Sequence, residues 1–499
     1  MFQKVLIANR GEIACRIAAT LREMGIRSVA VCSEADRGAL HTRVADEVRV
    51  IGPAEARASY LDIAALLRAA RESGAQALHP GYGFLAENAE FAAAVEAAGL
   101  VFIGPTPDQV RAMGDKRAAR ELAQRAGVPV VPGAEGDDAE TLVRAAKKLG
   151  YPVMIKAALG GGGKGMRAAA DEAELREGIE GARRVALSGF GDASIYLEQR
   201  IDRARHIEVQ VLGDGRGEVL HLFERECSLQ RRHQKVIEET PSAVVDEALR
   251  ERLTAAAVSF AAAAKYRGAG TVEFLLAPGG EFYFLEMNTR LQVEHPVTEC
   301  LTGLDLVRLQ LEIAAEGRLP LAQRDVTRRG HAIEARVYAE DAAHGFLPQA
   351  GRASRVQWST APFTRVDAGL ESGDEVPVHY DPIVAKVIAQ APSRPLALAR
   401  LAQALDASLV HGVITNLPFL RALVRAPQVA EARFDSEWIE REFLAGFETL
   451  AQAPAPELAM AAAALAEALG GASTPAGPSA AEPPDPFRSA GRWRLPGLD

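Results

Sequence analysis

Short apolar runs alternate with amphipathic stretches over the first hundred residues. Residues 4–8 (KVLIA) and 28–32 (SVAVC) have the length and composition of buried strands, whereas residues 13–24 and 61–73 carry apolar side chains at helical spacing. Further strand-like runs are residues 47–51, 75–78 and 101–103. This alternation predicts a parallel, doubly wound sheet whose ligands gather at the carboxyl ends of the strands. Because no GxGxxG motif follows these strands, we do not expect a nicotinamide site.

The pattern changes further along the chain. A small α+β unit centred on a run of glycines extends from about residue 129 to 199, and a longer α+β segment follows to about residue 443. Residues 451–484 are rich in Ala, Pro and Ser, which predicts a helix and a flexible linker. The ending WRLPG, residues 493–497, looks like the start of a further unit that is cut off.

Composition and charge exclude several classes of protein. The 499 residues suffice for three or four domains at about 100–200 residues each. A net charge of −9 argues against a nucleic-acid-binding surface, which is usually basic. The four cysteines form no CxxC pair, so neither a zinc signature nor a disulfide framework is expected. No apolar run approaches the ~20 residues of a membrane span. We therefore expect a cytoplasmic protein that binds neither nucleic acid nor membrane.

A glycine-rich loop follows one strand-like run. Residues 151–158 (YPVMIKAA) lead into GGGGKG, residues 160–165. Consecutive glycines let backbone N–H groups close around an anion, and Lys156 would add positive charge beside the phosphates. The loop is not a P-loop, because Lys164 is followed by Gly165 rather than by Ser or Thr. We favour phosphate binding over a flexible hinge.

Residues 271–288 predict a β-hairpin with a pair of opposed carboxylates. Gly279-Gly280 is a favoured two-residue turn, which would place Phe274 opposite Leu285 and Glu273 opposite Glu286. Like charges on adjacent strands repel, so one carboxyl is protonated or a cation lies between them.

Asn288 adds a neutral oxygen on the same face as Glu286. Two carboxylates and an amide oxygen suit Mg²⁺ or Mn²⁺, with nucleotide phosphates completing the coordination shell. An ordinary exposed sheet end is the alternative.

Two neighbouring segments add charge to this region. Arg290, Gln292 and Glu294 alternate, so an extended segment would place them on one face beside the metal. A base and an oxyanion-binding arginine suit such a site, and a structural Arg–Glu pair is the alternative. Upstream, residues 231–235 (RRHQK) form a basic run, which we interpret as an anion pocket rather than a solvated face.

Seven motifs in order resemble the biotin carboxylase component of biotin-dependent acyl-CoA carboxylases, an ATP-grasp enzyme. They are IANRGEIA (residues 7–14), HPGYGFLAEN (79–88), MGDK (113–116), GGGGKGM (160–166), RRHQKVIEE (231–239), EMNTRLQVEHPVTE (286–299) and GHAIEARVYAED (330–341). The resemblance covers about residues 1–445. The linker and the ending are similar, more weakly, to the long α-subunits of methylcrotonyl-CoA or related acyl-CoA carboxylases.

The resemblance implies a mixed α/β and α+β chain with an ATP-grasp fold. A doubly wound parallel-sheet N-terminal domain precedes this fold, which includes a small mobile lid. The implied divisions are an N-terminal domain (1–112), a connecting helix (113–128), the lid (129–200), the ATP-grasp catalytic domain (201–330), a C-terminal domain (331–445), and a linker with the start of a truncated further domain (446–499).

The implied reaction consumes ATP and bicarbonate and carboxylates biotin. Glu294 would deprotonate bicarbonate, which attacks the γ-phosphate to give carboxyphosphate and ADP. Carboxyphosphate would release CO₂ and a phosphate that removes the biotin N1 proton, with Arg290 stabilising the biotin enolate. Phosphoryl transfer depends mainly on positioning and charge stabilisation, so cations and metals would do most of this work.

The resemblance also implies roles for individual residues. ATP would contact Lys116, Lys156, Gly162, Gly163, Glu198, Gln199, Arg200, Ile201, His206, Gln230, His233, Glu273 and Glu286. Glu273, Glu286 and Asn288 would hold Mg²⁺ or Mn²⁺. Bicarbonate would bind Lys235, Arg290, Gln292 and Val293, and biotin would lie near Arg336 and Tyr82. The implied catalytic residues are Lys235, Arg290, Glu294 and Arg336.

The lysines suggest where biotin is carried. No lysine follows Lys386, so we expect biotin on a carrier domain or carrier protein outside this chain, and we expect the chain to be truncated. A carboxyltransferase subunit and a homo-oligomer are further family expectations. The alternatives are another ATP-grasp carboxylate–amine or carbamoyl-phosphate-type ligase, and a nucleotide-binding scaffold without activity.

Overall fold

The computed structural model of this chain describes residues 1–136, 138–157, 166–190, 192–451 and 465. The chain divides into two compact units, residues 1–448 and 449–499, and the architecture described below concerns the first. Gly162 and Gly163, predicted to bind phosphate, lie outside the described residues. Among the described residues no helix has both the length and the apolar character that a membrane crossing requires.

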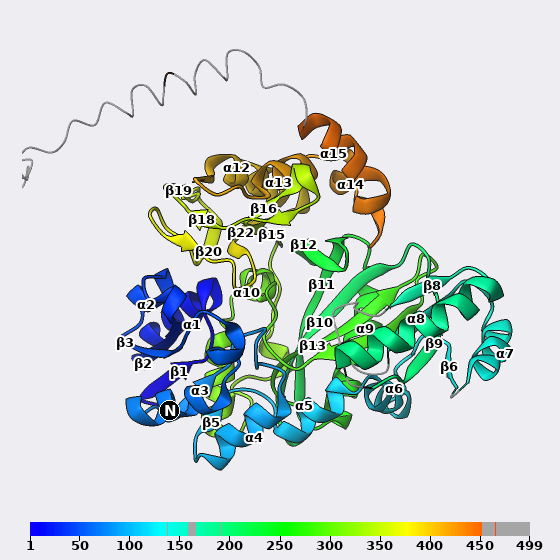
Figure 1. The fold of residues 1–499 in the computed structure, drawn as a ribbon, viewed down its shortest axis with the longest axis horizontal. Coiled ribbons are helices and arrows are strands. Elements are labelled where there is room, and N and C mark those ends of the chain that lie inside the picture. Colours follow the sequence, from blue (N-terminus) through cyan, green and yellow to red (C-terminus); the bar gives the residue numbers. More distant parts are fainter. Residues whose placement is uncertain (137, 158–165, 191, 452–464, 466–499) are drawn as a thin grey trace, which may run out of the picture. The chain divides into compact units, whose positions relative to one another are not determined.

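The predicted N-terminal parallel sheet is confirmed (Figure 1). Its strands run in the order β3-β2-β1-β4-β5, and every neighbouring pair is parallel. The bounds are β1 Lys4–Ile7, β2 Arg27–Ser33, β3 Glu47–Gly52, β4 Ala77–His79 and β5 Val101–Phe102, with helices α1 Gly11–Glu23, α2 Leu40–Val44, α3 Ile63–Ser73 and α4 Ala89–Ala97. The order places the loops after β1 and β4 side by side, because these strands are neighbours.

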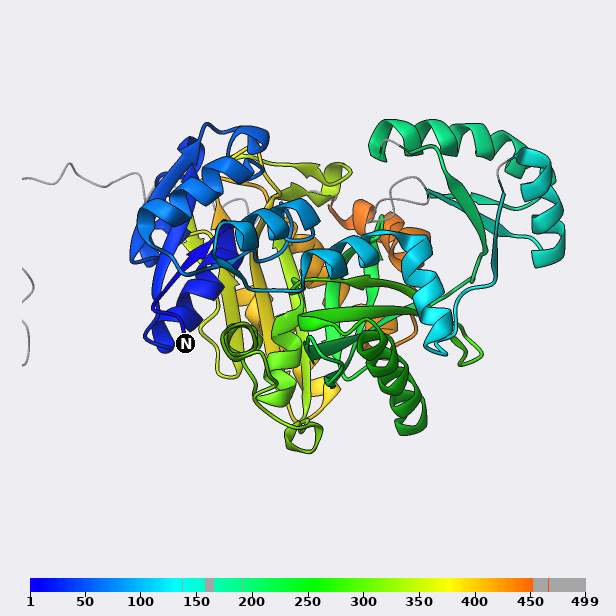
Figure 2. The same ribbon diagram turned by 90° about the horizontal axis from the view of Figure 1, so that it is seen from below.

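Two helices, α5 (Pro107–Gly114) and α6 (Lys116–Arg125), connect this sheet to a second, smaller one. Asp115 separates the two helices. Its side chain accepts hydrogen bonds from the Arg117 and Ala118 backbone N–H groups and so caps α6. The smaller sheet has the order β6-β9-β7-β8, and α7 and α8 pack against it (Figure 2). Its elements are β6 Gly133–Glu135, α7 Ala139–Leu149, β7 Val153–Ala157, β8 Arg167–Ala169, α8 Glu172–Phe190 and β9 Ile195–Gln199.

An eight-stranded sheet with the order β14-β13-β10-β11-β12-β15-β22-β20 carries most of the candidate site. Because β12 pairs with β15, the sheet continues across the domain boundary expected at residue 330. The strands are β10 Arg205–Asp214, β11 Val219–Arg231, β12 Gln234–Thr240, β13 Arg267–Leu276, β14 Phe282–Asn288, β15 His331–Tyr338, β20 Thr364–Ala368 and β22 Ile383–Ala391.

Helices and short strand pairs complete the first unit, and the last helix, α15, extends three residues past its end. The helices are α9 Glu247–Ala263, α10 His295–Thr302, α11 Leu306–Glu316, α12 Arg394–Ala407, α13 Leu417–Val424, α14 Pro427–Ala430 and α15 Leu444–Ala451. The short strands are β16 Glu340–Asp341, β17 Leu347–Pro348, β18 Gly351–Arg352, β19 Arg355–Gln357, β21 Glu375–Val376 and β23 Leu409–His411.

For the β13–β14 hairpin, the predicted turn is wrong and the predicted pairing of the two glutamates is confirmed. The turn is a three-residue loop, Pro278 to Gly280, closed by a hydrogen bond of 2.8 Å from the Ala277 N–H to the Glu281 carbonyl. Gly280 has φ +87°, the left-handed conformation that closes such loops, and Phe274 therefore pairs with Phe284 instead of Leu285.

A β-bulge next to Glu273 then shifts the register by one residue. As a result, Glu273 does pair with Glu286, as predicted.

Candidate active site

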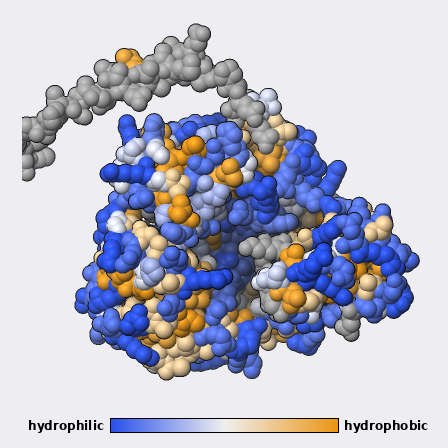
Figure 3. Space-filling model, viewed as in Figure 1, coloured by the Kyte–Doolittle hydropathy of each residue, from blue (hydrophilic) through white to orange (hydrophobic). Residues whose placement is uncertain are grey.

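A cavity of about 780 Å³ lies between the N-terminal loops, α5 and α6, and the large sheet. The molecular surface is hollowed near the centre of the face shown in Figure 3, and hydrophilic residues border most of that hollow. Eleven of the predicted site residues line the cavity, namely Tyr82, Lys116, His233, Lys235, Glu273, Glu286, Asn288, Arg290, Gln292, Val293 and Arg336.

Lys235 is the central cation of the site. Its Nζ lies 2.5 Å from Glu208 Oε2, 2.8 Å from Glu273 Oε1 and 2.6 Å from Glu294 Oε1. The three N–H groups of the ammonium thus each meet a carboxylate. Burial lowers the pKa of Lys235, but the three carboxylates outweigh burial and hold that pKa well above its ordinary value. The site therefore keeps a permanent positive charge beside Glu294.

Glu294 is fully buried and bridges two cations. Its Oε2 lies 2.8 Å from Arg336 Nη2, while Oε1 contacts Lys235. Burial alone would raise the pKa of Glu294, but Lys235, Arg336 and Arg225 lower it well below its ordinary range. Glu294 is therefore an unprotonated carboxylate, as a general base requires.

The conformation predicted for the segment around Glu294 is wrong. Residues 290–294 do not form an extended strand, because Glu294 has φ −82° and ψ 10° and stands at the N-cap of α10. Arg290 and Gln292 still face the cavity, and the carboxylate of Glu294 reaches the same cluster through Lys235. A tight turn ahead of the helix, rather than alternation along a strand, brings the three side chains together.

The pKa values of Glu273 and Glu286 are shifted in opposite directions, as expected for two opposed carboxylates. Lys235 and His206 outweigh burial and lower the pKa of Glu273, whereas burial and the charge of Glu273 raise the pKa of Glu286. Asn288 Nδ2 donates to Glu273 Oε1 at 2.8 Å. With Glu286 lining the cavity, these oxygen-bearing side chains form a donor set that fits Mg²⁺ or Mn²⁺.

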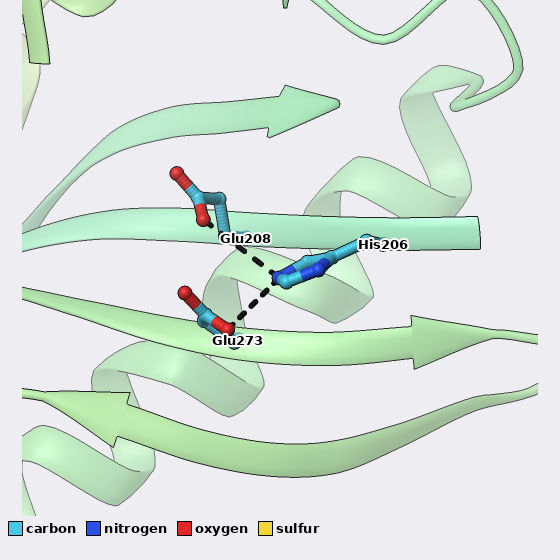
Figure 4. A group of neighbouring side chains, drawn as sticks. All are labelled: His206, Glu208 and Glu273. Carbon is cyan, nitrogen blue, oxygen red and sulfur yellow. Dashed lines mark ion pairs between the residues drawn. The ribbon is translucent and has the colours of Figure 1, made fainter. Parts of the chain in front are cut away.

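His206, Glu208 and Glu273 form a second group, whose side-chain ligand atoms lie close enough together to hold a metal ion (Figure 4). His206 Nε2 lies 2.9 Å from Glu273 Oε2 and 3.9 Å from Glu208 Oε2. The ammonium of Lys235 already contacts both glutamates, at 2.5 and 2.8 Å. Lys235 therefore balances the charge of this group, and we place the candidate metal at the Glu273–Glu286 pair rather than between His206 and Glu208.

Some residues predicted to contact the nucleotide lie at the cavity, and others lie in the smaller sheet. Lys116 lines the cavity, and burial lowers its pKa despite the nearby Glu286. In the smaller sheet, Lys156 forms an ion pair with Glu198, whose other oxygen lies 2.8 Å from Arg120 Nη1.

Other residues predicted to contact the nucleotide are not among those that line the cavity. Arg200 forms an ion pair of 2.8 Å with Glu437. Gln199 ends β9 and Ile201 follows it by two residues, while Gln230 is buried on β11 opposite Lys235.

Several residues that hold the site in place were not predicted from the sequence. Glu208 pairs directly with Glu273 across β10 and β13, and fully buried Arg225 donates to Glu208 at 2.6 Å. Glu238 lies 2.5 Å from Arg336. The alternation of His206 with Glu208 on one strand was a signal that could have identified Glu208. The sequence gives no local signal for the other two, because their partners come from distant strands.

Glu87 was also missed as a site residue, although it belongs to the HPGYGFLAEN motif. Its Oε2 accepts from Arg290 Nε at 2.9 Å, which ties Arg290 to the N-terminal domain.

Family models match almost all of the first unit. The biotin carboxylase N-terminal domain matches residues 1–110, and the biotin carboxylase C-terminal domain matches residues 334–441. Between them, the ATP-binding domain of the carbamoyl-phosphate synthase L chain matches residues 115–322.

Individual relatives are similar over most of the chain. The biotin carboxylase of Pseudomonas aeruginosa is 49% identical over 445 residues, which are 89% of this chain and 99% of that protein. The α-subunit of rat mitochondrial methylcrotonoyl-CoA carboxylase is 52% identical over 425 residues, 84% of this chain. The match spans only 59% of the rat protein's length.

Solved structures agree with the architecture. A Campylobacter jejuni biotin carboxylase in a βγ-ATP complex superposes with a TM-score of 0.86 at 41% identity, covering 89% of this chain and 99% of that one. The biotin carboxylase domain of Hydrogenobacter thermophilus 2-oxoglutarate carboxylase, in complex with MgADP, ADP and bicarbonate, gives a TM-score of 0.85 at 43% identity, with 88% and 97% covered.

Proposed function

The chain belongs to the biotin carboxylase family of ATP-grasp ligases, and we propose that it performs the first half-reaction of an acyl-CoA carboxylase. In that reaction ATP, bicarbonate and a biotin carrier give ADP, phosphate and the carboxybiotin carrier. One observation carries the assignment. Lys235 and Arg336, which line the cavity together with the Glu273–Glu286 pair, both contact the buried carboxylate of Glu294.

Bicarbonate binding fits the cations around Glu294. In the structure Lys235 directs its N–H groups at three carboxylates, and an incoming anion would take over some of these contacts. Because ion pairing lowers the pKa of Glu294, loosening its contact with Lys235 raises its basicity at the moment bicarbonate arrives. Glu294 then accepts the bicarbonate proton, and a bicarbonate oxygen forms a bond to the γ-phosphorus as the bond to ADP breaks.

The remaining roles follow from position. Glu273, Glu286 and Asn288 would hold Mg²⁺ or Mn²⁺, which neutralises phosphate charge when bound. Lys116 and Lys156 would position the phosphates. Arg336 is charged and borders the cavity, so it can hold carboxyphosphate or the biotin ureido oxygen, and Tyr82, which also lines the cavity, would lie near the ring. Arg290, fixed by Glu87, would stabilise the enolate.

The whole carboxylase would need partners. We propose a carrier that bears biotin on a lysine outside this chain, a carboxyltransferase subunit that selects the acyl-CoA, and a homo-oligomeric assembly. For residues 1–445 we also propose the domain divisions given above, which the three matching family models support. Names of relatives support these assignments, including propionyl-CoA carboxylase α-chain from Ruegeria pomeroyi, 47% identical over 488 residues.

A carbamoyl-phosphate-type ligase is the second candidate, because the central family model carries that name. The two candidates differ in their dependence on biotin. We expect ADP release from Mg-ATP to require bicarbonate and to increase on addition of free biotin. ADP release that needs bicarbonate and ammonia but ignores biotin would favour the second candidate.

A further inference from the structure

A chain of four groups, of which Glu12 and Lys386 are buried, connects two parts of the cavity wall. The Tyr82 hydroxyl donates to Glu12 Oε1, and Glu12 Oε2 lies 3.1 Å from Lys386 Nζ. Lys386 Nζ in turn donates to the Val293 carbonyl at 3.0 Å. Tyr82, Glu12 and Val293 line the cavity, whereas Lys386 is not among the lining residues and is 0% exposed.

Besides Glu12, the carboxyl groups of Glu334 and Asp367 act on Lys386. It lies on β22, in register with Arg336 of β15, and its next contact is Asp367 Oδ2 at 3.8 Å. Asp367 is already neutralised by Arg365, which donates to both of its oxygens at 2.7 Å. Buried Glu334 also faces Lys386, but burial raises the pKa of Glu334 well above its ordinary value and keeps it protonated. Above pH 7, where Glu12 is ionised, Glu12 is therefore the main counter-charge of Lys386.

Stability alone does not explain this lysine. Burying a charged pair is costly, and apolar residues of similar volume often stabilise a core equally well or better. The geometry instead gives Lys386 a directional task, because its ammonium fixes the carbonyl of the peptide between Val293 and Glu294. Movement of that peptide would displace both the backbone expected to bind bicarbonate and the carboxylate of Glu294.

We propose that Lys386 is a positioning residue, which holds the Val293–Glu294 peptide and ties it through Glu12 to the Tyr82 side of the cavity. This inference rests on the proposed function, in which bicarbonate binds at Val293 and biotin lies near Tyr82. A ligand that presses on Tyr82 changes its hydrogen bond to Glu12. The ion pair between Glu12 and Lys386 then changes, and with it the position of the Val293 carbonyl. Binding of biotin near Tyr82 would thus alter the bicarbonate site.

The test compares Lys386→Met with Lys4→Met in the full chain. Lys4 is a matched control, because its Nζ also contacts one carboxylate, Glu47 at 2.7 Å, and one backbone carbonyl, Ser73 at 2.7 Å, away from the cavity. We expect Lys386→Met to raise KM for bicarbonate about tenfold, the loss typical of one hydrogen bond from a charged donor. KM for Mg-ATP should change less than about twofold, and the stimulation of ADP release by free biotin should fall. Lys4→Met should leave all three unchanged.

Glu12→Gln provides a second variant should Lys386→Met not fold. Glutamine keeps the size of the side chain and an oxygen for Tyr82 but removes the charge that holds Lys386, so biotin stimulation should fall more than bicarbonate affinity. Unchanged bicarbonate KM and biotin stimulation in the folded variants would overturn the inference, as would equal changes in Lys4→Met. If the unaltered protein shows no bicarbonate-dependent ADP release, the proposed function fails, and this inference fails with it.

Discussion

Replacing Glu294 with glutamine tests the assignment of the general base most directly. The change keeps the shape of the side chain but removes its negative charge and its ability to accept a proton. Because Glu294 is 0% exposed, water cannot easily take over that role. We expect turnover to fall by about 10²- to 10⁴-fold, the usual contribution of a positioned general base.

The structure also predicts that the variant folds and binds ATP. Lys235 keeps Glu208 at 2.5 Å and Glu273 at 2.8 Å, and Arg336 keeps Glu238 at 2.5 Å, so neither cation is left unpaired. The loss of stability should therefore be about 1–3 kcal/mol, the cost of a lost hydrogen bond to a charged group, rather than the larger penalty of an isolated buried charge.

The assay is ADP release with saturating Mg-ATP, bicarbonate and biotin, together with calorimetric titration of ATP. Glu299→Gln is the matched control, because Glu299 is also a buried glutamate that pairs with two cations, Arg16 at 2.8 Å and Arg365 at 2.7 Å. Unlike Lys235 and Arg336, neither of these arginines lines the cavity. An equal loss of turnover and ATP binding in Glu294→Gln would refute the role of the base. So would a comparable loss of turnover in Glu299→Gln.

Three further predictions concern neighbouring groups. Lys235→Gln should raise KM for bicarbonate at least tenfold with little effect on ATP affinity, because its side chain contacts the Glu294 cluster; unchanged bicarbonate dependence in steady-state kinetics would contradict this. Glu286→Gln should raise the Mg²⁺ concentration for half-maximal activity about tenfold in a metal titration. Glu281→Gln, at the exposed end of the hairpin, should leave that concentration unchanged, and equal Mg²⁺ requirements of the two variants would refute the metal site. Burial raises the pKa of Glu12 to about 7, against 4.5 in an unfolded chain, so the native state holds a proton that the unfolded state has lost. Stability should therefore fall by up to about 3 kcal/mol as pH rises from 4.5 to 7, and Glu12→Gln should remove that slope in calorimetric melts; parallel pH curves would be the contrary result. The groups facing Glu12 are Lys386, Asp367, Arg365 and Tyr82.

The sequence by itself determined the elements and the chemical character of the site. Alternating apolar runs specified the parallel N-terminal strands, because hydrophobic period and strand length are local properties. The hairpin pattern correctly opposed Glu273 and Glu286, although the turn and the bulge that produce this pairing were not foreseen. Motifs along the chain carried the resemblance to biotin carboxylases, which the relatives confirm.

Tertiary structure alone decided which charges neutralise one another. Glu208, Lys235 and Glu294 come from β10, β12 and the start of α10, and they meet only because the sheet places these elements around one point. Lys386 and Glu12 are more than 370 residues apart in the sequence, yet their side chains lie 3.1 Å apart beside the cavity. Electrostatic pairing depends on distance and burial, and neither can be read from local spacing once the partners lie on non-consecutive strands.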